Sequence, residues 1–163
     1  MISICCAIII LLAYIVCLCY RGGGVPSSLS ATVFDLPVGW KWLWTIVIYA
    51  VCFLCVPYYV EVTEENTQFL AFIAIAALAF VGAAPLVKEK ADLSYKVHCG
   101  AAVVCGVCSQ VVLALNLPIL LLLWPFWVAF LVFTHLQGNK WPTKTFWAEM
   151  VCFGSTFIYC LVR

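Results

Sequence analysis

Ionisable and hydroxyl-bearing side chains lie near the ends of several long apolar stretches of this chain. His98 begins one stretch, and Glu149 lies about one turn inside another. Groups of this kind are expensive to bury among apolar neighbours, so they are the first candidates for acid–base or binding chemistry. Anchoring at an interface, where such side chains stay hydrated, is the alternative for each of them. The catalytic candidates are His98, Glu149, Asp35, Ser28 and Ser30.

Helical spacing extends two of these candidates into polar faces. The residues that follow His98 on its helix face are Ala102, Cys105 and Ser109, and those that follow Glu149 are Cys152, Phe153, Thr156 and Cys160. Because lipid cannot hydrogen-bond them, two such faces are most stable when they face each other. We therefore predict a His98–Glu149 pair in a cavity that opens at their end of the bundle.

Metal binding is a second possibility at the same end. A zinc ion needs three or four protein ligands, and the candidates are His98, His135 and Glu149. His135 has a simpler interpretation as an interface residue, because a polar segment begins two residues after it. The sequence predicts no particular cofactor.

Two CxxC motifs, Cys52–Cys55 and Cys105–Cys108, have the spacing of redox and zinc sites. All eleven cysteines, however, fall inside apolar stretches, where a thiol is an inert packing residue. Packing is the expected role, with redox or metal chemistry as the alternative.

The composition identifies the environment of these residues. Of 163 residues, 67% are hydrophobic and 9% are charged, the net charge is +1, and the mean hydropathy is +1.16. So few charges cannot cover a water-facing surface, and there is no basic patch for nucleic acid. The sequence predicts an integral membrane protein with the lipid bilayer as its main partner.

Six apolar stretches approach the ~20 residues that cross a ~30 Å hydrocarbon core. The predicted spans are residues 2–20, 43–60, 69–87, 97–115, 117–135 and 146–162. We expect an all-α, polytopic transmembrane bundle that forms one domain over residues 1–163. Asn116–Leu117–Pro118 is read as a tight turn, because a single helix through it is too long for a bilayer.

The basic residues predict the orientation of the spans. Arg21 and Lys41, then Lys88, Lys90 and Lys96, then Lys140 and Lys144 lie on one side, against Arg163 alone on the other. Under the positive-inside rule this asymmetry makes the first side cytoplasmic and both termini non-cytoplasmic.

Small residues indicate how the spans pack. Spans 69–87 and 97–115 are rich in Ala and Gly, which permit close helix contacts, so we expect them at the centre. Span 117–135 is expected to face lipid, with a kink at Pro125, and Gln110 to make an interhelical hydrogen bond.

Four short segments of the chain resemble segments of other membrane proteins. Residues 28–32 (SLSAT), 68–72 (QFLAF), 80–85 (FVGAAP) and 96–98 (KVH) resemble segments of small uncharacterised bacterial multispan membrane proteins, over roughly residues 25–115. The resemblance implies a multispan fold in a bacterial inner membrane and no particular activity. The polar segment after the first span is also similar to that of the damage-regulated autophagy modulator family, where it lies on the opposite side of the membrane.

Intramembrane metal hydrolases of the ceramidase and adiponectin-receptor kind resemble this chain in having Ser, Asp and His at one membrane end. That resemblance implies zinc held by three histidines, whereas this chain has two, so Asp35 or Glu149 would have to act as a ligand.

The sequence leaves three functions open. The first is a non-enzymatic membrane component, such as an assembly partner, regulator or small carrier, with a homo-oligomer or another membrane protein as partner. The second is a lipid-modifying or metal-dependent enzyme with a polar site on the cytoplasmic side. The third is a proton-coupled transporter that uses His98 and Glu149.

Overall fold

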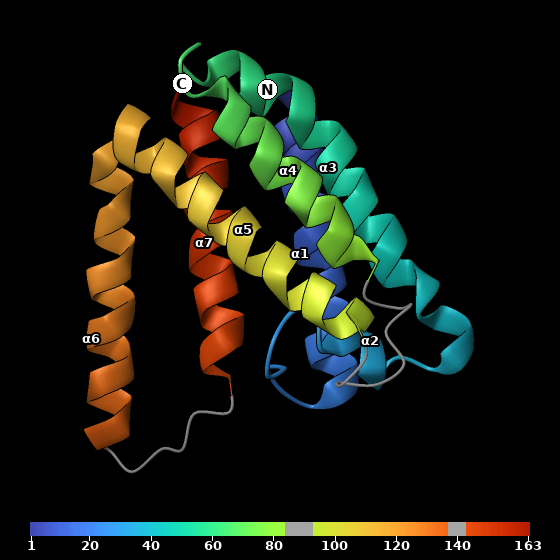
Figure 1. The fold of residues 1–163 in the computed structure, drawn as a ribbon. Coiled ribbons are helices and arrows are strands. Elements are labelled where there is room, and N and C mark those ends of the chain that lie inside the picture. The colour runs from blue at the N-terminus through green and yellow to red at the C-terminus, as the bar shows by residue number, and fades with distance from the viewer. Residues whose placement is uncertain (84–92, 137–142) are drawn as a thin grey trace.

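In the part of the chain that the structure describes, each of the six apolar stretches forms a helix, because a backbone in lipid must satisfy its hydrogen bonds within its own segment. The computed structural model describes residues 1–83, 93–136 and 143–163 (Figure 1). Six helices run up and down in chain order: α1 (Ile2–Gly22), α3 (Trp42–Val62), α4 (Gln68–Gly82), α5 (Leu93–Asn116), α6 (Leu123–Leu136) and α7 (Lys144–Val162). Short helices α2 (Thr32–Asp35), η1 (Val38–Trp40) and η3 (Pro118–Leu122) lie in the connections.

The predicted all-α membrane bundle is confirmed. Five segments are long and apolar enough to span a membrane: Ile2–Gly22, Trp42–Val62, Lys96–Asn116, Pro118–Leu136 and Lys144–Val162. The sixth apolar helix, α4, has 15 residues and extends about 22 Å, which is shorter than a ~30 Å core. The predicted span 69–87 continues beyond α4 into residues outside the described ranges. Within those ranges the chain contains no strand.

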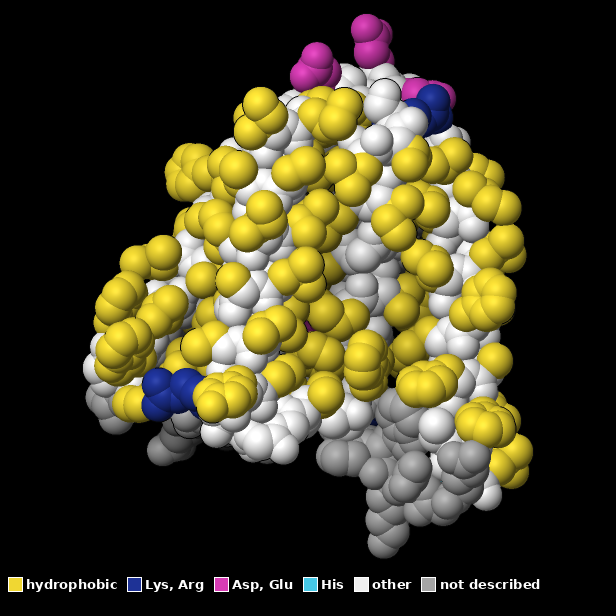
Figure 2. Space-filling view, turned by 180° about the vertical axis from the view of Figure 1, so that it is seen from behind, with side chains coloured by type: hydrophobic (Ala, Val, Ile, Leu, Met, Phe, Trp, Pro, Cys, Tyr) yellow, Lys and Arg dark blue, Asp and Glu magenta, His cyan; other side chains and the backbone are white. Residues whose placement is uncertain are grey.

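Charge separates along the helix axes. Both termini lie at one end of the bundle, beside Glu61 in the last turn of α3 and beside the connection that carries Glu64 and Glu65 (Figure 1). Arg21, Lys41, Lys96 and Lys144 belong to helix ends at the opposite side. Figure 2 shows acidic side chains at the first end and a broad hydrophobic band between the two ends. We call these the acidic end and the basic end of the bundle.

Helix α4 packs against α3 on one side and α5 on the other, as expected of a central span. Gly82 permits the close approach of α3, because an added Cβ would lie 3.0 Å from Cγ2 of Ile48. The hydroxyl of Thr45 also donates to the Gly82 carbonyl oxygen at 2.9 Å. Small residues therefore set the α3–α4 contact, in agreement with the sequence pattern.

Helix α6 is the least buried helix of the bundle, as predicted. Over 18 residues of the segment Pro118–Leu136, which contains α6, only 6% are buried. Helix α6 contacts α7 and η3. Helix α5 ends at Asn116 and η3 begins at Pro118, so the predicted turn is confirmed. The predicted kink at Pro125 corresponds to a change of helix type and not to a bend within one α-helix. The chain changes from 3-10 to α-helix at Leu123, which places Pro125 in a first turn that needs no N–H from it.

Candidate functional site

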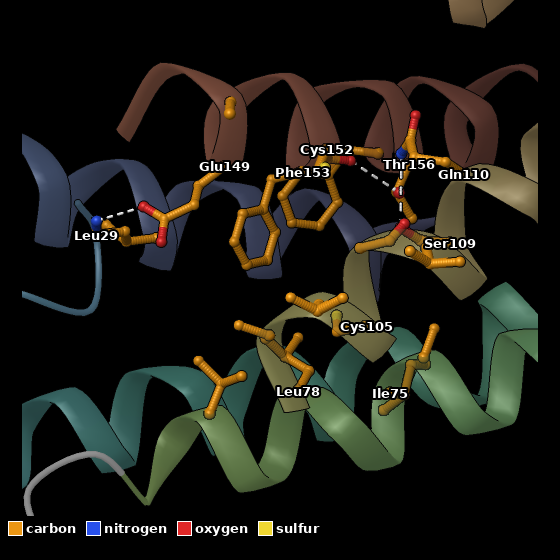
Figure 3. Close-up of a pocket in the computed structure, with 18 of the residues that line it drawn as sticks. Leu29, Ile75, Leu78, Cys105, Ser109, Gln110, Glu149, Cys152, Phe153 and Thr156 are labelled. Atoms are coloured by element: carbon orange, nitrogen blue, oxygen red, sulfur yellow. Dashed lines mark hydrogen bonds between the residues drawn. The ribbon is translucent and has the colours of Figure 1, made fainter. Parts of the chain in front are cut away.

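A cavity of about 840 Å³ lies between α3, α4, α5 and α7. The residues predicted to follow His98 and Glu149 on their helix faces all line it: Ala102, Cys105 and Ser109 from α5, and Cys152, Phe153, Thr156 and Cys160 from α7. Figure 3 shows Ile75 and Leu78 of α4 beyond Cys105, across the space from Phe153. The prediction that the two faces oppose each other is therefore correct, and the space between them is largely apolar.

Glu149 lies at the basic end of this cavity. Its Oε2 accepts a hydrogen bond from the backbone N–H of Leu29 (Figure 3). The Ser28 hydroxyl lies in the same turn and shares a hydrogen bond of 3.1 Å with the Ser30 hydroxyl. Ser30 and Thr145 line the cavity beside it. The structure thus brings together three of the five catalytic candidates: Ser28, Ser30 and Glu149.

The connection between α1 and α3 places Ser28 and Ser30 near Glu149, because this connection packs on the first turn of α7. The carbonyl oxygen of Ser27 accepts the Phe146 N–H at 3.2 Å, which is one of the N–H groups that a helix start leaves without an internal partner. Leu29 is buried beside it. The Ser28 hydroxyl accepts the Ala31 N–H at 3.1 Å and so fixes the turn that leads into α2.

His98 occupies a different environment, and the expected pair with Glu149 does not form. Its imidazole donates to the carbonyl oxygen of Val81, which also accepts the indole N–H of Trp44 at 3.1 Å. The side chain is 8% exposed, and its Nδ1 has no hydrogen-bond partner among the described residues. His98 therefore helps to tie α5 and α3 to the end of α4, outside the lining of the cavity.

The structure does not gather the metal candidates. His135 is exposed near the end of α6, while His98 and Glu149 have the separate partners described above. In residues 1–83, 93–136 and 143–163, no three His, Cys, Asp or Glu side chains are close enough to hold a metal ion. Asp35 belongs to α2, but its side chain lies outside what the structure describes.

A polar network crosses the bundle near the middle of α5. Gln110 accepts the indole N–H of Trp124 at 2.8 Å and donates to the hydroxyl of Ser155 at 3.2 Å. It thereby links α5, α6 and α7, which confirms the expected interhelical hydrogen bond. Since both functional groups of the amide are engaged, the network fixes the helices around the cavity.

Tyr59 marks the acidic end of the cavity, and sequence reasoning did not single it out. The side chain is 2% exposed and lines the cavity, but its hydroxyl has no partner in the described part of the chain. Its ring contacts Tyr159 edge-on, with the ring centroids 6.2 Å apart. In the sequence, Tyr59 resembles any other aromatic residue inside an apolar span. Only the packing of the helices shows that its hydroxyl lacks a hydrogen-bond partner among the described residues.

The cysteines are free thiols, all eleven of them. Cys55, Cys105, Cys152 and Cys160 line the cavity, where they contribute small apolar surface.

Comparison with known proteins finds no family model, curated protein or solved structure that matches this chain.

Proposed function

We propose that this protein is a non-enzymatic membrane component, a small carrier or a regulator, that binds the apolar chain of a lipid-like molecule. The observation that carries the proposal is the cavity of about 840 Å³ with the Glu149 carboxylate at its basic end. Sites for small molecules usually enclose about 300–1,000 Å³, with mostly apolar walls and a few polar groups that orient the ligand. This cavity has the same design.

Filling the cavity tests the proposal. Gly106 lines it, and a Cβ added there would lie 3.9 Å from Sγ of Cys152, so Gly106→Leu places its remaining carbons in the space between α5 and α7. We expect the wild-type protein to retain one lipid in native mass spectrometry, and Gly106→Leu to reduce that retention at least about tenfold, since the inserted side chain displaces apolar ligand surface.

Gly100→Leu is the matched control, because Gly100 lies on the same helix, is exposed and has no neighbouring atom within 4 Å of an added Cβ. Gly106→Ala, which fits the available space, is expected to keep the ligand. Equal retention by Gly106→Leu and Gly100→Leu, with unchanged circular dichroism, would contradict the proposed site.

We propose that the basic end faces the cytoplasm, in the inner membrane of a bacterium. The support is the seven-to-one distribution of basic residues and the resemblance to bacterial multispan proteins. It follows that Arg163 and Met1 lie on the outer side, together with the acidic connection.

Reporter fusions measure this orientation. Alkaline phosphatase fused after Arg163 is expected to be active, and green fluorescent protein at the same site to be dark. The two reporters should exchange their behaviour when fused after Gly24, at the basic end of α1. Fluorescence from the fusion at Arg163 would reverse the proposed orientation.

A further inference from the structure

The carboxylate of Glu149 accepts a hydrogen bond from the backbone but has no cation beside it in the described part of the chain. Its hydrogen-bond donor is the N–H of Leu29, with the Ser28 hydroxyl in the adjoining turn, and no Lys, Arg or His pairs with it among the residues that the structure describes. A carboxylate offers about four acceptor positions, so this contact leaves capacity for further donors. The open part of this capacity lies at the cavity, which Glu149 lines.

The length of the cavity suits one apolar chain. From Glu149 to Cys160, the lining along α7 covers about three turns or roughly 16 Å. One leaflet of a ~30 Å hydrocarbon core is about 15 Å thick, so a lipid chain has this length. A chain that follows α7 places one terminus at Glu149 and the other near the acidic end.

We propose that the cavity binds an amphiphile with a protonated amine, whose ammonium group contacts Glu149 and whose chain lies between α5 and α7. This inference rests on the proposed function and specifies the class of ligand. An ammonium group supplies the missing positive charge and three N–H donors, which Glu149 and the hydroxyl oxygens of Ser30 and Thr145 can accept. A fatty acid would bring a second negative charge to the same place.

Three probes of equal chain length separate the headgroups: tetradecylamine, tetradecanol and tetradecanoate, each added at neutral pH to the purified full-length protein. Native mass spectrometry is expected to show the amine bound at least about tenfold more tightly than the alcohol, and the carboxylate most weakly. This comparison uses the wild-type protein and does not depend on any variant folding.

Glu149→Gln keeps a side-chain oxygen that accepts the Leu29 N–H and removes the charge. We expect it to weaken binding of tetradecylamine by roughly ten- to a hundredfold and to leave tetradecanol nearly unchanged. Glu61→Gln is the matched control, because Glu61 is an exposed glutamate near the acidic end of α3. It should leave the affinity of all three probes unchanged.

The ammonium group can come from a free single-chain amine or from the headgroup of a phospholipid. Nanodiscs that contain phosphatidylethanolamine distinguish them: a retained phospholipid that tetradecylamine displaces identifies the headgroup, and retention of tetradecylamine alone identifies the free amine. Equal affinities for the three probes that Glu149→Gln does not change would overturn the inference. If Gly106→Leu nevertheless abolishes binding of all three probes, the proposed lipid-binding function stands and only the preference for an amine is wrong.

Discussion

Trp44→Ala is expected to lower the free energy of unfolding by about 3–5 kcal/mol, the range for truncation of a buried Trp or Phe. Trp44 is 1% exposed, and it packs against Tyr14 with ring centroids 5.9 Å apart. Its indole N–H donates to the Val81 carbonyl oxygen near the C-terminal end of α4. Truncation therefore leaves a void between α1, α3 and α4 and removes a buried hydrogen bond.

Reversible unfolding of the purified protein in mixed micelles of detergent and sodium dodecyl sulfate measures this change. Trp42→Ala is the matched control: Trp42 lies two residues earlier on α3, is 54% exposed, and should cost less than about 1 kcal/mol. Trp44→Phe retains much of the ring volume and isolates the hydrogen bond, for which we expect about 1 kcal/mol. A similar loss for Trp42→Ala and Trp44→Ala would contradict the role of Trp44 in the core.

Asn116→Ala is expected to cost about 2–3 kcal/mol, more than the ~0.6 kcal/mol average of an interhelical hydrogen bond in a membrane. Asn116 is 6% exposed, and its Oδ1 accepts the backbone N–H of Glu64 at 3.0 Å. Its Nδ2 donates to the Thr67 hydroxyl at 3.0 Å. Alanine leaves the part-buried backbone N–H of Glu64 without this partner, and the resulting desolvation penalty adds to the lost bonds.

The same unfolding experiment tests Asn116, with Asn66→Ala as control. Asn66 lies in the connection that Asn116 binds but is exposed, so its truncation should change stability by less than about 0.5 kcal/mol. A double-mutant cycle of Asn116→Ala with Thr67→Val should show coupling of at least about 0.5 kcal/mol. Additive losses would mean that the hydrogen bond between the two side chains contributes nothing to stability.

Helical periodicity predicted much of the cavity, because spacing along a helix determines which residues share a face. Spacing alone predicts two opposed faces that contain Cys105, Ser109, Cys152 and Thr156, and all four residues line the cavity. Periodicity does not determine how far one helix is displaced or tilted relative to another. Helix α5 crosses the bundle obliquely (Figure 1), and the imidazole at its basic end reaches the end of α4 instead of Glu149.

The partners of Glu149 were beyond sequence reasoning for a related reason. They come from the backbone of Leu29, whose N–H carries no signature in the residue type. The sequence predicts only a helix stop at Asn116, because a turn residue and a residue that binds the neighbouring connection have the same sequence pattern. The sequence shows the polar side chains of Glu149 and Asn116, but it does not show which backbone N–H group each of them binds.

The docking of residues 27–29 on α7 has a consequence for the order in which the protein is made. The N–H of Leu29 meets the Glu149 carboxylate across a sequence separation of 120 residues, and the Ser27 carbonyl meets the Phe146 N–H nearby. Synthesis proceeds from the N-terminus, so these early backbone groups have no final partner until α7 has emerged and inserted. The carboxylate end of the cavity is therefore completed only when α7 joins the helices that precede it.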